Sequence, residues 1–393
     1  MNTLATDSIL DGRIYERRLS YEILRGSDKI GENLIEIMGY GQNILLECGR
    51  ALTATADTSA IERRVLRTRY DAVIITHAHA DHCGLLDEPL AASAIYMGEH
   101  TRTILCEKGR LCRKNEDKTV VMTSGESFFL GEIRITPHLC DHSVADSYMI
   151  EVSDNIMTIL YTGDFRSHGR KSFDALLRRL PTQVDVLICE RTTDVPLHRT
   201  EQALEEDAAR LMQTYKDVFV LQSSVNVDRI VSFYKASRQT GRPLLVPPIV
   251  AQLTRHMSHI PNPKTFADCF LYFPRNPSKQ MHTLAVQSYG ARLISRDRVA
   301  AMPSFTMLVT AGMLDYIKRL AARRDLSHAV LVYSIWRGYK ADMRDFLDGV
   351  RALGIEVVDL HVSGHADRDA IDALIAHTHP RSIRYVHTDG VVQ

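Results

Sequence analysis

One short stretch, Thr76 to His82 with the sequence THAHADH, restricts the chemistry of this chain more than any other. It directly follows an apolar, β-type run, so we expect a loop at the carboxyl end of a buried strand. Neutral imidazole nitrogens and carboxylate oxygens are the ligands that zinc and similar divalent ions prefer. His77 and His79 project to the same side of an extended loop and can share one ion, while Asp81 and His82 can turn toward a second. The alternative is a polar loop whose histidines only cap a helix.

The length and composition limit the classes of protein to which this chain can belong. A chain of 393 residues is longer than one hydrophobic core usually serves, so we expect two domains. The 48 basic residues balance the 48 acidic ones, which argues against a broad polybasic surface for nucleic acid but leaves room for a local basic cleft. The seven cysteines have no regular spacing, and no apolar run approaches the length that spans a membrane. We therefore expect a cytoplasmic protein with reduced thiols and no membrane partner, of open oligomeric state.

The pattern of expected strands and helices changes after Glu190. Before this residue the pattern is mainly β with helices between. After it, strands and helices alternate, which predicts a parallel sheet covered on both faces. The expected elements of this second half are helix 201–215, strand 218–221, helix 227–238, strand 244–246, strand 305–310, helix 314–324, strand 329–333, helix 341–353, strand 356–360, helix 368–377 and strand 383–386.

Two further polar residues follow expected strands at points where buried sheets present their chemistry. His142 comes just after a hairpin-like stretch, and Asp164 comes just after a strand, behind Gly163, which lets the backbone approach closely. Taken alone, a histidine in a loop is more often not a ligand, and an aspartate in a turn is more often a cap. The order and spacing of these residues relative to the histidine-rich stretch change that balance.

The order His-x-His-x-Asp-His, then a His, then a Gly-Asp resembles the motif series of the metallo-β-lactamase fold. The runs HSVADS at 142–147 and TGDFR at 162–166 are similar to motifs of ribonuclease J-type proteins. Glu190 resembles the acidic first motif of the β-CASP subfamily, and HVSGHA at 361–366 resembles its second motif. His387 stands where the third motif places a histidine, which is typical of RNA-type members.

This resemblance implies an α/β protein with two domains. Residues 1–198 and 353–393 would form a metallo-β-lactamase αββα sandwich. Residues 199–352 would form an inserted β-CASP α/β domain with a parallel sheet. One departure concerns Glu47, which stands where the family usually has Asp in its first strand motif.

The resemblance also implies two Zn²⁺ ions, with Mn²⁺ as the alternative metal. In the implied assignment the first ion binds His77, His79 and His142, the second binds Asp81, His82 and His387, and Asp164 bridges both. The implied reaction is attack of a metal-bound hydroxide on single-stranded RNA, which leaves 5′-phosphate products. Endonuclease and 5′-exonuclease action stay open.

Further residues would act on the substrate. His365 is the candidate general acid, because imidazole titrates near neutral pH, and Glu190 would hydrogen-bond it and fix its tautomer. Asp81 is expected to be essential for catalysis as a ligand. The candidate contacts to RNA are Ser363, Gly364, His361, Ser223, Ser224, Arg166, Arg170, Lys171, Arg229 and a base-stacking Trp336. The plainer alternatives are a structural role for His361, a helix cap at 223–226 and burial of Trp336.

Two other functions fit parts of the pattern. A thioesterase or lactonase-type hydrolase of small esters uses the same metal fold, but a small ester needs no inserted domain. A non-catalytic RNA-binding or scaffolding protein would be expected to have lost ligands, whereas this chain keeps the full set.

Overall fold

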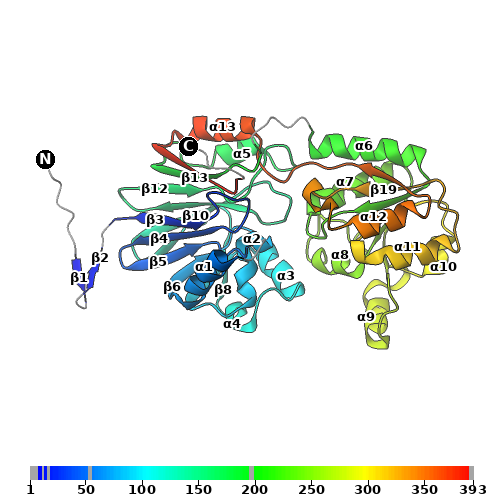
Figure 1. Ribbon diagram of the computed structural model, residues 1–393, viewed down its shortest axis with the longest axis horizontal. Coiled ribbons are helices and arrows are strands. Elements are labelled where there is room, and N and C mark those ends of the chain that lie inside the picture. The colour runs from blue at the N-terminus through cyan, green and yellow to red at the C-terminus, as the bar shows by residue number, and fades with distance from the viewer. Residues whose placement is uncertain (1–7, 11–12, 16–17, 52–54, 194–198, 389–393) are drawn as a thin grey trace. The chain divides into compact units, whose positions relative to one another are not determined.

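The computed structural model describes residues 8–10, 13–15, 18–51, 55–193 and 199–388 (Figure 1). The chain divides into two compact units. Unit 1 comprises Met1–Leu197 and Gly364–Gln393, and unit 2 comprises His198–Ser363. The chain returns to unit 1 at Gly364 rather than at the expected residue 353. The intervening residues stay in unit 2 because the strand they contain pairs with the central sheet of that unit.

Unit 1 contains two six-stranded sheets, with the strand orders β3-β4-β5-β6-β7-β8 and β21-β13-β12-β11-β10-β9. A separate antiparallel pair is formed by β1 (Ser8–Leu10) and β2 (Arg13–Tyr15). The strands of the two large sheets are β3 (Ser20–Arg25), β4 (Leu34–Gly39), β5 (Gln42–Leu46), β6 (Tyr70–Ile74), β7 (Ala92–Met97), β8 (Thr119–Val121), β9 (Phe128–Leu130), β10 (Ile133–Leu139), β11 (Tyr148–Ser153), β12 (Thr158–Tyr161), β13 (Val186–Glu190) and β21 (Ser382–Val386).

Helices cover the outer faces of these two sheets (Figure 1). Side chains such as Ile44 from the first sheet and Ile150 from the second share one buried apolar cluster. A second cluster joins the other face of the second sheet to Leu176 and Leu374 on its covering helices. The helices are α1 (Ala56–Arg67), α2 (Ala80–Cys83), α3 (Glu99–Glu107) and α4 (Arg113–Glu116) beside the first sheet, and α5 (Phe173–Leu177) and α13 (Arg368–Thr378) beside the second. The expected αββα layering is confirmed.

Strand direction places several loops of unit 1 at a common edge. Strands β12, β13 and β21 are parallel, and β10 runs the same way because both β10 and β12 are antiparallel to β11. The segments that leave the carboxyl ends of these strands therefore emerge together. This edge carries the polar residues described below.

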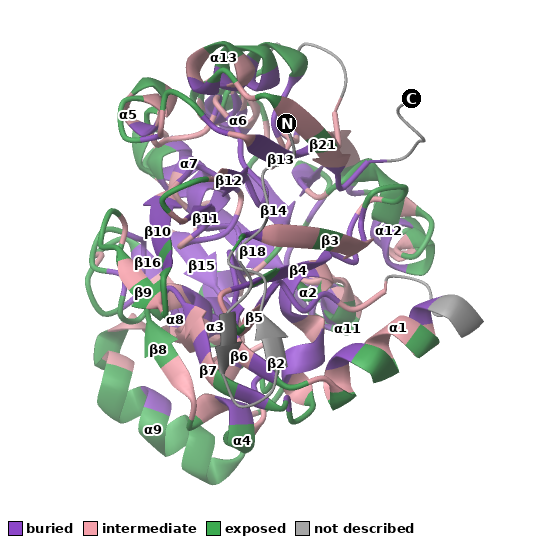
Figure 2. Ribbon diagram, turned by 90° about the vertical axis from the view of Figure 1, so that its left-hand side faces the viewer, coloured by how far each residue is buried: buried purple, intermediate pink, exposed green. Residues whose placement is uncertain are grey.

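Unit 2 is built on a seven-stranded parallel sheet with the order β17-β16-β15-β18-β14-β19-β20. Strands β14, β15 and β18 are buried along their whole length (Figure 2), as expected for a parallel sheet with both faces covered. The strands are β14 (Asp217–Leu221), β15 (Leu244–Val246), β16 (Cys269–Tyr272), β17 (Leu293–Ile294), β18 (Phe305–Val309), β19 (Ala329–Tyr333) and β20 (Glu356–Asp359).

The helices of unit 2 cover both faces of its sheet (Figure 1). Helices α6 and α7 pack against each other, as do α11 and α12, and the last two contribute to one large apolar cluster with the strands. The helices are α6 (Glu201–Thr214), α7 (Val227–Gln239), α8 (Pro248–Leu253), α9 (Lys279–Tyr289), α10 (Arg296–Ala300), α11 (Leu314–Ala321) and α12 (Arg344–Arg351). Within the described residues, no helix has the length and apolar character that a membrane crossing requires.

Candidate metal centre

The histidine-rich stretch leaves the carboxyl end of β6 and turns into the short helix α2. His77 and His79 lie in the loop, and Asp81 and His82 lie on the helix. The loop starts at a fixed place because β6 is paired in parallel with both β5 and β7. His77 and His82 are fully buried, which is costly for polar side chains unless they have partners.

Two glycines let neighbouring segments approach this loop. A Cβ atom on Gly49 would lie 1.9 Å from the backbone oxygen of Asp81, so no larger residue fits there without a shift of the chain. Gly163 has a φ of 52°, and a Cβ atom on it would lie 3.0 Å from the Thr76 side chain and from the backbone oxygen of Tyr148. The close contact at Gly163 brings the next residue, Asp164, to the loop.

One group of ligand-type atoms comes from three segments. The Nδ1 atom of His79 lies 3.1 Å from Nε2 of His77 and 3.2 Å from Nε2 of His142. The Oδ2 atom of Asp164 lies 3.7 Å from Nε2 of His77 and 3.8 Å from Nε2 of His142. In a tetrahedral zinc site, bonds of about 2.0–2.1 Å place neighbouring ligand atoms about 3.3 Å apart. The spacing of these four atoms fits that geometry.

A second group shares the same carboxylate. Nε2 of His387 lies 3.1 Å from Oδ2 of Asp81, and Nε2 of His82 lies 3.3 Å from Oδ2 of Asp164. Within each group, Asp81–His82–His387 and His77–His79–His142–Asp164, all ligand atoms lie within 4.8 Å of one another. The structure thus brings together all seven residues that the sequence singled out as ligands.

The second ring nitrogen of four of these histidines is also held by a neighbour. Such contacts fix the tautomer and the ring orientation of metal-binding histidines. The contacts are His77 Nδ1 with Thr76 Oγ1 at 2.9 Å, His82 Nδ1 with Glu47 Oε1 at 3.2 Å, His142 Nδ1 with the Gly364 carbonyl oxygen at 2.6 Å, and His387 Nδ1 with Thr192 Oγ1 at 2.6 Å. No sequence pattern marks the roles of Thr76 and Thr192, because a threonine beside a strand end is common.

The charge balance of the site favours a cation. Burial, with the neighbouring imidazoles adding to it, lowers the pKa of His77 and His142 well below the usual value, so both rings are neutral. Burial lowers the pKa of His79 to about 4. Burial alone would also lower the pKa of His82, but the charges of Asp164 and its neighbours raise it. Neutral imidazoles beside clustered carboxylates are the form of these groups that binds divalent ions.

One oxygen of Asp164 supports the same conclusion. The carboxylate is 2 % exposed, and its Oδ2 faces the imidazoles described above. Its Oδ1 is buried and has no hydrogen-bond partner among the described residues. A buried carboxylate oxygen without a partner is costly, and a bound cation would satisfy it. The residues present therefore fit the binding of divalent cations.

Glu47 supports the candidate metal centre through its contacts with Thr76 and His82. It is fully buried, accepts hydrogen bonds from the backbone and hydroxyl of Thr76, and faces His82. Burial raises the pKa of its carboxyl. Glu47 has a φ of 64°, which is rare outside glycine and costs free energy. The Glu47 side chain thus reaches His82 from an unusual backbone position.

Replacing Glu47 by glutamine should weaken metal binding by about 10- to 100-fold, as is typical when a partner of a ligating histidine is lost. The amide keeps the shape of the carboxylate but removes its charge beside His82. Competition with a chromophoric chelator would measure the affinity. The matched control is Glu36→Gln, since Glu36 is also buried and hydrogen-bonded, to Tyr70, on the same sheet. An unchanged affinity for Glu47→Gln would rule out this supporting role.

Next to the two ligand groups lies an acid–base pair. His365 Nδ1 lies 2.9 Å from Glu190 Oε2 and 3.6 Å from Asp164 Oδ2. Glu190 is fully buried and also accepts hydrogen bonds from the backbone of Phe165 and the hydroxyl of Thr192. Burial opposes charge on His365, but Glu190 and Asp164 outweigh it and raise its pKa to about 9. At 23 % exposure, the His365 side chain is more accessible than the buried histidines beside it.

The expected RNA contacts fall in different places. Gly364 lies in unit 1, where its carbonyl oxygen contacts His142 and a Cβ would come within 3.1 Å of that ring. His361, Ser363, Ser223 and Ser224 lie in unit 2. Ser223 is exposed at the start of the turn before α7, but the cap of that helix is Asn226, whose side chain accepts from the backbone of Arg229.

The expectation for two arginines needs correction. Arg166 is fully buried, and its Nε donates to Asp141 Oδ1 at 2.6 Å. Arg229 is fully buried and binds Glu201 at 2.9 Å. A guanidinium enclosed in a buried ion pair cannot reach a phosphate in solvent, and loss of its partner would leave a buried charge uncompensated. Neither residue is a surface contact for RNA.

Comparison with known proteins agrees with this geometry. Residues 42–220 match the Beta-lactamase superfamily domain. The chain is 23 % identical to ribonuclease J of Sinorhizobium meliloti over 95 % of this chain and 70 % of that protein. It is 25 % identical to ribonuclease J of Mycobacterium tuberculosis over 93 % of this chain and 68 % of that protein. A crystal structure of a protein of unknown function from Enterococcus faecalis V583 has the same fold, with a TM-score of 0.76, 19 % identity and 94 % of each chain covered.

Proposed function

We propose that this chain, a metallo-β-lactamase protein of the ribonuclease J-like, β-CASP type, is a metal-dependent ribonuclease that cleaves single-stranded RNA and leaves 5′-phosphate products. The observation that carries the proposal is the single carboxylate of Asp164, which faces both groups of ligand-type side chains. Two-metal sites of this kind serve in-line displacement at phosphorus. The similarity to ribonuclease J over nearly the whole chain supports RNA as the substrate.

In this proposal His77, His79 and His142 hold one ion, Asp81, His82 and His387 hold the other, and Asp164 bridges the two. We propose zinc, with manganese as the alternative, because the ligand set mixes imidazole and carboxylate. Two divalent ions held there supply Lewis acidity toward the scissile phosphate and neutralise charge on its oxygens. The chain itself holds the ligand side chains in place and keeps water away from them by burying them. It also presents His365 to the substrate.

His365 acts as the general acid in this proposal. Glu190 accepts the hydrogen bond from Nδ1, and in this proposal Nε2 is the atom that gives a proton to the departing 3′-oxygen. The same carboxylate keeps the ring cationic, in line with the raised pKa of His365. Glu190 is therefore a positioning residue, and its buried contacts to Phe165 and Thr192 hold it in place.

One experiment separates the proposal from its competitors. The metal-loaded protein is incubated with end-labelled single-stranded RNA, with DNA of matched sequence, and with a generic thioester. We expect cleavage of the RNA and no turnover of the thioester. The Asp81→Ala variant, which lacks one ligand, should lose the RNA cleavage. Turnover of the thioester alone would replace the nuclease by an esterase, and intact RNA with a fully metallated protein would leave a binding protein.

Trp336 supplies a prediction for substrate binding. Its side chain is 53 % exposed and meets Tyr339, itself 43 % exposed, edge to face at 5.4 Å between ring centroids. Exposed aromatic rings stack with bases of single strands, at about 1–3 kcal/mol per base. We expect Trp336→Ala to raise the KM for single-stranded RNA about tenfold with little change in kcat. Trp336→Phe should retain most of the affinity, and an unchanged KM for the alanine variant would remove Trp336 from the substrate path.

A further inference from the structure

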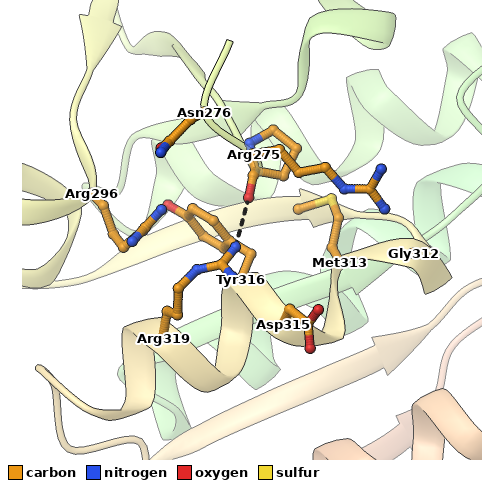
Figure 3. A pocket seen from close by; sticks show the side chains of 9 residues that line it. Arg275, Asn276, Arg296, Gly312, Met313, Asp315, Tyr316 and Arg319 are labelled. Carbon is orange, nitrogen blue, oxygen red and sulfur yellow. Dashed lines mark hydrogen bonds between the residues drawn. The ribbon is translucent and has the colours of Figure 1, made fainter.

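A basic cavity lies in unit 2, and none of the residues assigned above lines it. It has a volume of 390 Å³ and is lined by segments that follow β16, β17 and β18 (Figure 3). Because these strands are parallel, the three segments emerge at the carboxyl edge of the sheet. This is the edge where open parallel sheets bind their ligands. The polar and charged lining residues are Arg275, Asn276, Arg296, Asp315, Tyr316 and Arg319.

Three guanidinium groups line this cavity against one carboxylate, that of Asp315. Arg319 donates to the backbone oxygen of Pro274 at 3.2 Å, which ties α11 to the loop after β16. In the described part of the chain, neither Arg275 nor Arg296 forms an ion pair, whereas Arg323 pairs with Asp297 and Arg324 with Asp217. The cavity thus carries uncompensated positive charge, which favours an anionic ligand.

Tyr316 contributes a hydroxyl group to the cavity wall. The residue is 1 % exposed, yet its hydroxyl has no hydrogen-bond partner among the described residues. Its ring lies between Arg296 and Arg319 (Figure 3), and the Arg296 guanidinium stands 5.5 Å from the ring centroid. The Nε of Arg296 is also buried and without a partner. Buried donors without partners are rare, and an acceptor bound in the cavity would satisfy both.

A second cavity, of 400 Å³, adjoins the first and shares Arg275, Asn276 and Arg296 with it. It adds His282 and Arg323, although Arg323 is paired with Asp297. Volumes of this size suit a nucleotide-sized ligand. The shared arginines stand between the two cavities, where they can reach a group bound in either.

We propose that this cavity binds a phosphate group, through Arg275, Arg296 and Arg319 and the Tyr316 hydroxyl. Arginine suits this role because its planar fork matches the oxygens of a phosphate. The phosphate belongs either to a free nucleotide or to the backbone of a single strand. The inference uses residues of unit 2 only and does not depend on the metal centre or on the proposed ribonuclease activity.

Hydrogen exchange on the full metal-loaded chain tests this without any mutation. The probes are inorganic phosphate, AMP, adenosine and an oligouridylate with no terminal phosphate, all at matched ionic strength. We expect phosphate-bearing probes to protect residues 273–277 and 311–319, and adenosine to leave them unchanged. Protection by phosphate and AMP identifies a free ligand, whereas protection by the oligonucleotide alone identifies backbone phosphate. Equal protection by adenosine and AMP, or none by any probe, overturns the proposal.

A double variant gives the affinity. Arg296→Gln with Arg319→Gln should weaken the binding that protects these residues by about tenfold or more, since hydrogen bonds to charged groups are lost. The matched control is Arg298→Gln, which changes an exposed arginine on the same helix α10 that lines neither cavity. Equal affinity of the double variant and the control would overturn the proposal. Because Asp81→Ala removes a ligand of the proposed metal centre and leaves every cavity residue intact, loss of ribonuclease activity and loss of this site are told apart.

Discussion

Asp164→Asn should abolish RNA cleavage and strip the protein of metal. The side chain is buried, and its Oδ2 lies within 3.8 Å of nitrogens of His77, His82, His142, His365 and His387. An asparagine fills the same volume but carries no charge, so it cannot bridge two cations. We expect cleavage to fall by on the order of a thousandfold or more, equivalent to about 4 kcal/mol of transition-state stabilisation.

Two measurements check this result. Elemental analysis after gel filtration reports bound metal, and end-labelled RNA reports cleavage. The matched control is Asp154→Asn, because Asp154 caps the turn at the opposite end of the β11–β12 hairpin and takes no part in the site. If Asp164→Asn kept two ions per chain and near-normal cleavage, the bridging assignment would be wrong.

His365→Ala should keep both ions yet lose about 10²- to 10⁴-fold in cleavage, the usual contribution of a general acid. The residue is also close enough to Asp164, Glu190 and His387 to count as a possible fourth member of a metal group. Metal content therefore decides between the two roles. A general acid touches the leaving group and leaves the ions in place, whereas a ligand would take metal with it.

Further variants test whether His365 acts as the general acid. Glu190→Gln should lower kcat while metal stays bound, because the amide no longer stabilises the cationic ring. His377→Ala, on the outer helix α13, is a control for loss of a histidine in the same unit. Depleted metal in His365→Ala would reassign the residue from acid to ligand.

Buried strands were the most predictable part of the fold. The expected strands 244–246 and 329–333 coincide with β15 and β19 residue for residue. Both are short apolar runs whose side chains are buried on both faces, and such runs have few alternatives to a central parallel strand. The polar dipeptide Asp154–Asn155 joins β11 to β12, which pair as an antiparallel hairpin.

Other elements lay beyond sequence reasoning. Helix α9 (Lys279–Tyr289) is largely exposed, with Met281, Leu284 and Val286 facing solvent, so no amphipathic pattern marked it. The expected return to the first domain at residue 353 was wrong because β20 adds an edge strand to the inserted sheet. Edge pairing depends on a distant strand and leaves little local signal.

The residues of the candidate site also differ in how well the sequence predicts their roles. Residues that bind by their own chemistry, such as His77 and Asp81, are recognisable because few other roles require that cluster. Residues that act through another side chain, such as Thr192 behind His387, are visible only once the chain is folded. Arg166 shows the converse, since a basic residue beside a ligand motif turned out to be buried with Asp141.

The position of β21 has a consequence for biosynthesis. This strand follows the inserted unit in the sequence and pairs with β13, which precedes that unit. The residue after the strand is His387, which faces Asp81, 306 residues earlier in the sequence. Translation must therefore pass residue 387 before the group Asp81–His82–His387 is complete. We expect any shortened product that stops before β21 to be inert toward RNA.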